Sequence, residues 1–89
     1  MERLKGKVAL ISGAAKGMGA VEARMFAKEG ASLVLGDVLE DEGAKLALEI
    51  SAGGTSCVFT PLDVRKTSQW ESAVTKATSA YGRLDILVN

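Results

Sequence analysis

Four short apolar runs alternate with three helical patterns along this chain of 89 residues. The apolar runs cover residues 8–11, 32–35, 56–59 and 84–88, and they are mostly continuous rather than interrupted by polar residues. Continuous runs of this length are typical of strands that are covered on both faces. Their regular alternation with helices predicts an α/β fold with a parallel sheet and right-handed crossovers. A chain of this length makes at most one small domain.

The helical patterns are expected over residues 17–29, 40–51 and 68–81, each followed by a glycine that can end the helix. Side chains that repeat at helical spacing predict the packed faces: Ala20, Ala23 and Ala27; Ala44, Ala47 and Leu48; Trp70, Val74, Ala77 and Tyr81. A second apolar stripe on the first helix contains Met18, Val21 and Met25. The spacing of Ser68 and Glu71 predicts a capping box at the start of the third helix.

A glycine-rich loop joins the first apolar run to the first helix. Gly13, Gly17 and Gly19 form the pattern G-x3-G-x-G. Glycine adopts positive φ and keeps side-chain atoms away from the backbone. Gly13 is predicted to make the tight turn off the strand, while Gly17 and Gly19 admit a pyrophosphate and let the helix pack on the sheet. A loop in this context, between a strand and a helix, predicts a dinucleotide site at the helix N-terminus rather than a plain turn.

Asp37 follows the second apolar run, where a carboxylate can accept hydrogen bonds from the adenosine ribose. The alternative is a solvated loop aspartate that caps the next helix. A 2′-phosphate beside this carboxylate would cost on the order of several kcal/mol, which favours NAD over NADP. Lys16 in the loop could instead contact a 2′-phosphate or the pyrophosphate, or simply be solvated. Asp37 is the stronger determinant of the choice between NAD and NADP, because its place at the end of the strand fixes how far its carboxylate can extend.

The charge balance and the cysteine content argue against several other classes of function. Eleven basic and eleven acidic residues cancel, so no basic field is expected for a nucleic acid or an anionic membrane. With no histidine and a single cysteine, we expect no metal site. Cys57 lies in an apolar run and is expected in the core, and a lone cysteine fits a reducing, cytoplasmic setting. The first apolar segment is too short for a signal peptide or a membrane span.

Four motifs, in order, carry a resemblance to one family. Residues 6–13 resemble the first strand and turn of the short-chain dehydrogenase/reductase family, and the glycine spacing is that family's. Asp63 and Val64 resemble the pair that contacts adenine in the family. Residues 82–89 resemble the segment entering its Asn-Asn-Ala-Gly motif. Ser12 stands where threonine is usual, and Met18 where isoleucine is common.

The resemblance implies a Rossmann-type parallel sheet of strand order 3-2-1-4, truncated after the fourth strand, so that residues 1–89 form part of a dinucleotide-binding domain. It implies hydride transfer between a nicotinamide and a secondary alcohol or ketone in the intact enzyme, with hydroxysteroid dehydrogenase-like members as the nearest kind. The intact form is expected to be a homo-oligomer. The candidate cofactor-binding residues are Ser12, Gly13, Lys16, Gly17, Met18, Gly19, Asp37, Val38, Asp63, Val64 and Asn89.

The catalytic serine and the Tyr-x-x-x-Lys pair of the family have no counterpart in this chain. Tyr81 is followed four residues later by Asp85, not by lysine, and Cys57 has no histidine to activate it. We therefore expect no catalytic residue here and no dehydrogenase activity from the chain alone. The competing hypothesis is a non-catalytic nucleotide-binding module or an inactive truncated fragment.

Overall fold

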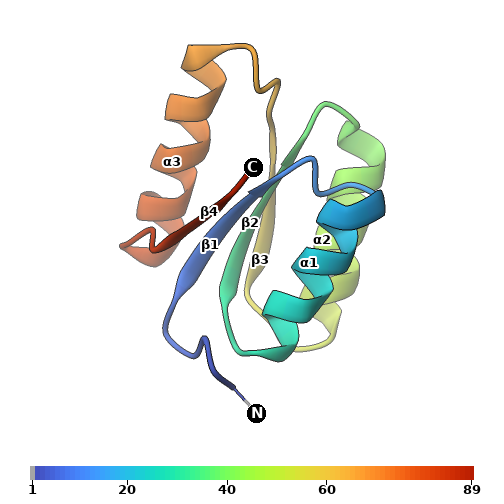
Figure 1. The fold of residues 1–89 in the computed structure, drawn as a ribbon, viewed down its shortest axis with the longest axis vertical. Coiled ribbons are helices and arrows are strands. Elements are labelled where there is room, and N and C mark those ends of the chain that lie inside the picture. The colour runs from blue at the N-terminus through green and yellow to red at the C-terminus, as the bar shows by residue number, and fades with distance from the viewer. Residues whose placement is uncertain (1) are drawn as a thin grey trace.

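A four-stranded parallel sheet forms the centre of the structure, a computed structural model that describes residues 2–89 (Figure 1). The strand order is β3-β2-β1-β4, as the family resemblance predicts. The elements are β1 (Val8–Ser12), α1 (Gly17–Lys28), β2 (Ser32–Asp37), α2 (Glu40–Ala52), β3 (Cys57–Pro61), α3 (Thr67–Tyr81) and β4 (Ile86–Val88). Within residues 2–89, no helix has both the length and the apolar character that a membrane crossing requires.

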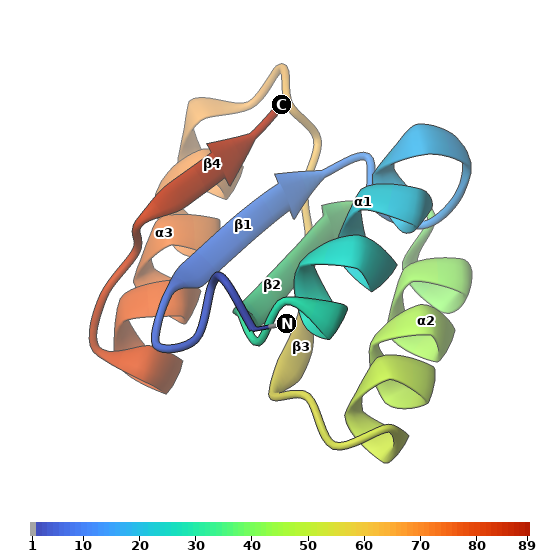
Figure 2. The ribbon, with the colours of Figure 1, turned by 60° about the horizontal axis from the view of Figure 1, so that its bottom comes forward.

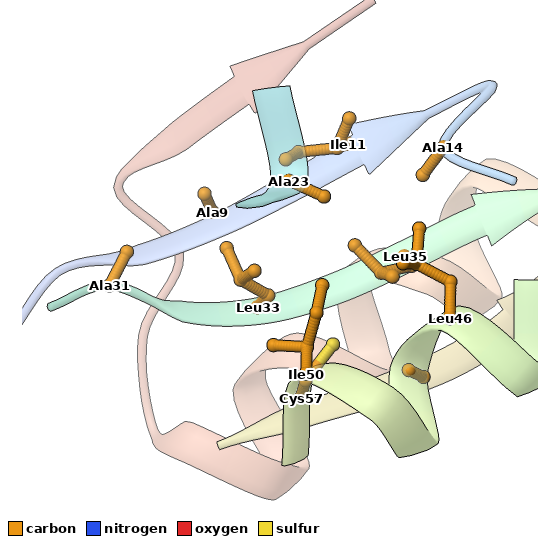
Figure 3. Packing of buried hydrophobic residues seen from close by; sticks show 11 residues of the cluster. Ala9, Ile11, Ala14, Ala23, Ala31, Leu33, Leu35, Leu46, Ile50 and Cys57 are labelled. Atoms are coloured by element: carbon orange, nitrogen blue, oxygen red, sulfur yellow. The ribbon is translucent and has the colours of Figure 1, made fainter. Parts of the chain in front are cut away.

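Two helices cover one face of the sheet and one helix covers the other (Figures 1 and 2). The first face carries α1 and α2, whose buried side chains meet Ala9 and Ile11 of β1 and Leu33 and Leu35 of β2 (Figure 3). The opposite face carries α3, which packs on Val8, Leu10 and Val34 among others. Alternate residues of β1 and β2 therefore point into different cores, which explains why their sequences read as continuous apolar runs.

The strand boundaries differ from the predictions by one or two residues. β3 begins at Cys57 rather than residue 56, and β4 begins at Ile86 rather than residue 84. β2 continues to Asp37, so this residue ends the strand instead of following it. Pro61 ends β3, which lies at an edge of the sheet where a missing N–H group is tolerated.

The predicted buried stripe of α2 was wrong in two of its three positions. Ala47 is buried, but Ala44 and Leu48 are exposed. The face that meets the sheet instead carries Gly43, Leu46, Ala47 and Ile50. Gly43 accounts for the difference, because an added Cβ there would lie 2.6 Å from Cδ1 of Phe59. The helix therefore approaches β3 along a side that the apolar pattern alone does not mark.

Two further details of the helices differ from expectation. The stripe of Met18, Val21 and Met25 on α1 is exposed, and Ala23 is the fully buried contact with the sheet. The capping box was also wrong, since α3 begins at Thr67 and has no side-chain cap at Lys66. Gly82 ends α3 in the left-handed region, at a φ of 80°, as its position predicts.

Candidate functional site

The predicted site residues gather at the carboxyl end of the sheet. The loop after β1, the end of β2 and the end of β4 all lie at this edge (Figure 2). Parallel strands bring their carboxyl ends together, so residues far apart in the sequence meet here.

The glycine loop has the backbone geometry that its spacing predicts. Gly13 and Gly17 have φ values of 63° and 65°, in the region that side chains disfavour. A Cβ added at either glycine would meet no heavy atom within 4 Å, so their surroundings are open. Gly19 differs, because a Cβ there would lie against the carbonyl group of Gly13 and 2.9 Å from Cα of Ala14. Gly19 therefore lets the first turn of α1 lie directly on the loop.

The start of α1 has no side-chain partner for its amides. Lys16 occupies the N-cap position with an extended backbone, and its side chain makes no capping bond. No acidic residue lies in the first turn, in contrast to α2, which begins with Glu40, Asp41 and Glu42. Lys16 and Met18 are both exposed beside these amides. An uncapped helix start with no acid in its own first turn favours an anion.

Asp37 is buried, with 8% of its surface exposed, and its carboxylate is engaged with the backbone. The amide of Ala15 donates to Oδ2 at 3.0 Å, and the amide of Leu39 donates to Oδ1 at 2.9 Å. The alternative of a solvated loop aspartate is therefore wrong. The bond to Leu39 lies in the turn just before α2, and α2 itself has no side-chain cap, so Asp37 does not cap that helix.

A cavity of about 310 Å³ opens beside Asp37. It is lined by Gly13, Asp37, Val38, Leu62, Asp63, Val64 and Arg65. Val38 and Val64 are exposed in this position. The cavity thus joins the turn of the glycine loop to two acid–valine pairs, Asp37 and Val38 at the end of β2 and Asp63 and Val64 after β3.

The carboxylate of Asp63 is held by Arg65. The backbone amide and Nε of Arg65 each donate to Oδ1 at 3.0 Å, and Nη2 donates to Oδ2 at 2.8 Å. These bonds hold the pKa of Asp63 well below its usual range. The amide of Asp63 donates to Oε1 of Gln69 at 2.6 Å, which fixes the loop against α3. Sequence reasoning missed Arg65, although its spacing of two residues from Asp63 is the available signal.

Ser12 links β1 to the end of β4. Its Oγ lies 3.2 Å from the carbonyl oxygen of Val88 and 3.2 Å from Oδ1 of Asn89. A hydroxyl carries one proton, so it donates to one of these acceptors at a time. Asn89 is thereby held at the same edge of the sheet as the glycine loop.

Tyr81 and Cys57 have packing roles. The Tyr81 hydroxyl donates to the carbonyl oxygen of Leu33 at 3.0 Å, and burial, with a smaller contribution from Cys57, raises its pKa to about 12. Burial also raises the pKa of the Cys57 thiol to about 12, which leaves it protonated and unreactive near neutral pH. Neither side chain has the lowered pKa that an activated nucleophile needs.

Comparisons with known proteins agree with this geometry. The family model described as short chain dehydrogenase matches residues 7–89. The chain is 45% identical over 87 residues to 2,5-dichloro-2,5-cyclohexadiene-1,4-diol dehydrogenase of Sphingobium indicum, covering 98% of this chain and 35% of that protein. It is 46% identical over 87 residues to 3-alpha-(or 20-beta)-hydroxysteroid dehydrogenase of Mycobacterium tuberculosis, covering 98% and 32%. The chain thus spans about a third of the length of these relatives.

A solved structure extends the likeness to three dimensions. A short-chain dehydrogenase/reductase from Burkholderia phymatum, in complex with NAD, superposes with a TM-score of 0.92 at 33% identity. The match covers 98% of this chain and 31% of that one. With a family model matched along residues 7–89 and the parallel sheet in the predicted order, the chain belongs to the short-chain dehydrogenase/reductase family of oxidoreductases.

Proposed function

We propose that this chain is the NAD(H)-binding part of a short-chain dehydrogenase/reductase. The observation that carries the proposal is the glycine loop, which has positive φ at Gly13 and Gly17 and runs into an uncapped helix. The pyrophosphate would lie over this loop at the N-terminus of α1, where Lys16, Met18 and Gly19 also lie. The Burkholderia phymatum structure, a complex with NAD, supports a nicotinamide dinucleotide here.

The adenosine half would occupy the cavity beside Asp37. The ribose hydroxyls would donate to this carboxylate, and the adenine would meet Val38, Asp63 and Val64, as the family resemblance implies. Ser12 and Asn89 lie at the same edge of the sheet and would meet the cofactor beyond its pyrophosphate. All these residues belong to one partial dinucleotide-binding domain over residues 1–89.

The buried carboxylate of Asp37 supports NAD rather than NADP. A 2′-phosphate carries nearly two negative charges and would meet this carboxylate within a few ångströms. Isothermal titration calorimetry of the 89-residue chain should give a dissociation constant for NAD at least tenfold below that for NADP, a difference of about 1.4 kcal/mol. Equal or tighter binding of NADP would assign the dominant role to Lys16 instead.

A matched pair of glycine variants tests the loop itself. Gly17 and Gly6 have φ values of 65° and 82°, and a Cβ would meet no neighbour within 4 Å at either position. Gly17→Ala and Gly6→Ala should therefore strain the backbone by similar amounts, about 1 kcal/mol. Only Gly17→Ala should weaken NAD binding. Equal NAD affinities for the two variants would place the cofactor elsewhere.

For the intact enzyme we propose hydride transfer between the nicotinamide and a secondary alcohol or ketone on a ring. The support is chemical, since the relatives are named for a cyclohexadiene diol and a hydroxysteroid. The 89-residue chain alone should form no NADH from such alcohols, because it lacks the family's catalytic serine and its Tyr-x-x-x-Lys pair. Steady NADH formation by this chain would contradict the proposal.

A non-catalytic nucleotide-binding module is the second candidate. The described residues are compatible with it, since Tyr81 and Cys57 both have raised pKa values and neither is an activated nucleophile. Sequencing the transcript beyond the codon for Asn89 separates the two proposals. An Asn-Ala-Gly segment followed by Tyr-x-x-x-Lys supports the dehydrogenase, and a natural stop codon supports the module.

A further inference from the structure

Asp37 joins three segments of the chain that are separate in sequence. Its carboxylate accepts from Ala15 in the glycine loop and from Leu39 before α2, at 3.0 and 2.9 Å. Its carbonyl oxygen accepts from the amide of Leu62, after β3, at 3.1 Å. With 8% of its surface exposed, Asp37 is a buried residue that connects these three segments, and its side chain does not extend freely into solvent.

The glycine loop is attached to β2 through two consecutive amides. Ala14 donates to the carbonyl oxygen of Gly36 at 3.1 Å, which continues the pairing of β1 with β2. Ala15 has no such strand partner and donates to the side chain of Asp37. Beyond it the backbone turns through Lys16 and Gly17 into α1. The Asp37 bond is therefore the last attachment of the loop to the sheet before the helix begins.

We propose that Asp37 is a positioning residue for the phosphate-binding loop, in addition to a ligand of the ribose. The inference rests on the proposed binding of a dinucleotide. Hydrogen bonds from backbone amides to a carboxylate are among the stronger ones in proteins, and they hold the loop in the shape that receives the pyrophosphate before the cofactor arrives. Asp37 would thus act on the phosphates through the loop, without touching them.

One carboxylate can both hold the loop and bind the ribose. An ionised carboxylate has about four acceptor positions, and each oxygen of Asp37 uses one of them for a backbone amide. One position per oxygen stays available for a ribose hydroxyl. A ligand without ribose hydroxyls should therefore still bind more tightly when Asp37 is present. This effect distinguishes positioning of the loop from direct contact with the ribose.

Amide hydrogen exchange in the cofactor-free 89-residue chain tests the attachment. Asp37→Ala should speed the exchange of the Ala15 amide by at least about tenfold, whereas Asp37→Asn, which keeps one carbonyl oxygen, should change it less. Asp41→Ala, which removes an exposed acid in the first turn of α2, is the charge-matched control and should leave it unchanged. An unchanged Ala15 rate in Asp37→Ala overturns the proposal.

If Asp37→Ala does not fold, the wild-type chain still decides the point. A scalar coupling across the hydrogen bond, from the Ala15 nitrogen to the Asp37 carboxyl carbon, should be detectable by NMR. Its absence, with the loop otherwise assigned, overturns the proposal.

Binding of two ligands then separates positioning from ribose contact. The probes are NAD and its analogue that lacks both adenosine ribose hydroxyls. Asp37→Ala should weaken the analogue as well as NAD, by several-fold, and Asp41→Ala should weaken neither. Identical analogue affinities for wild type and Asp37→Ala overturn the positioning role. Failure of the wild type to bind NAD overturns the proposed function instead, and the exchange experiment still reports whether the carboxylate holds the loop.

Discussion

The two neighbours of β1 are held to it in different ways. β2 pairs with β1 over five residue pairs and is buried from Leu33 to Asp37, with side chains in both cores. β4 pairs with β1 over three residue pairs, and its Leu87 is 54% exposed although it lies opposite the fully buried Leu10. Packing thus secures the side of β1 that carries the glycine loop and Asp37.

Polar contacts add to partly buried apolar side chains on the other side. The amide of Val8 donates to Oδ2 of Asp85 at 2.9 Å, and the amide of Asp85 donates to the carbonyl oxygen of Val8 at 2.9 Å. Ser12 contributes its contacts with Val88 and Asn89 at the opposite end of the strand. The comparison shows that the adenosine and phosphate side of the candidate site has a buried strand, whereas the Asn89 side combines the partly buried Ile86 and Val88 with a few hydrogen bonds.

The largest contrast should come from the register pair Leu10 and Leu87. Leu10→Ala should reduce the free energy of unfolding by about 3 kcal/mol, because it opens a cavity in a closed core. Leu87→Ala removes an equal number of atoms from a half-exposed position and should cost less than about 1 kcal/mol. Urea denaturation followed by circular dichroism measures both. Similar losses would mean that β4 is packed as tightly as β2.

Gly19→Ala should have the next effect, about 2 kcal/mol, since its Cβ would press on the carbonyl group of Gly13. The neighbouring Met18→Ala, at a side chain that is 77% exposed, should change stability by less than about 0.5 kcal/mol. The same denaturation experiment applies. A stabilised Gly19→Ala variant would show that helix propensity, and not the loop contact, governs this position.

Tyr81→Phe should cost about 1 kcal/mol by removing the hydrogen bond to the Leu33 carbonyl. The raised pKa of Tyr81, about 12, adds a test by pH. Because the folded pKa exceeds the usual value of 10.0, the stabilisation is complete below pH 10.0 and is lost as the pH rises toward 12. Absorbance of tyrosinate reports the titration, since Tyr81 is the sole tyrosine. Ionisation near pH 10.0 would show that the hydroxyl is solvated.

The smallest effect is expected in acid, on the β4 side. Arg83, and after it the amide of Val8, hold the pKa of Asp85 below its ordinary value of 3.8. A lowered folded pKa stabilises the protein above pH 3.8, and this contribution is lost as the pH falls through the folded value. Asp85→Asn should therefore flatten the acid limb of the stability curve, by a modest amount because the group is exposed.

Much of the fold could be predicted from the sequence because its signals are local. Apolar runs, helical spacing and terminal glycines indicate the seven elements, and the family motifs give their order in the sheet. The errors occur where tertiary contacts determine which side of a helix is buried. Gly43 faces β3 because Phe59 needs the space, and no periodicity marks a glycine as part of a buried stripe.

The candidate site shows the same division. The glycine conformations follow from spacing alone, as at Gly13 and Gly17. The engagement of Asp37 with Ala15 crosses 22 residues and depends on where the folded loop leaves its amides, which the sequence does not display. Arg65 lies only two residues from Asp63, to which it donates hydrogen bonds. Oppositely charged neighbours are common in sequences, so this spacing alone does not predict the bond.

The uncapped start of α1 has a thermodynamic consequence. Its first-turn amides have no side-chain acceptor, and Lys16 adds positive charge where a helix already carries a positive dipole end. A bound anion would therefore stabilise this helix start. If the proposed cofactor binds there, the folded population depends on cofactor concentration, with a gain of about 2.7 kcal/mol when free ligand reaches one hundred times its dissociation constant. Folding and recognition would then be one coupled equilibrium rather than two successive events.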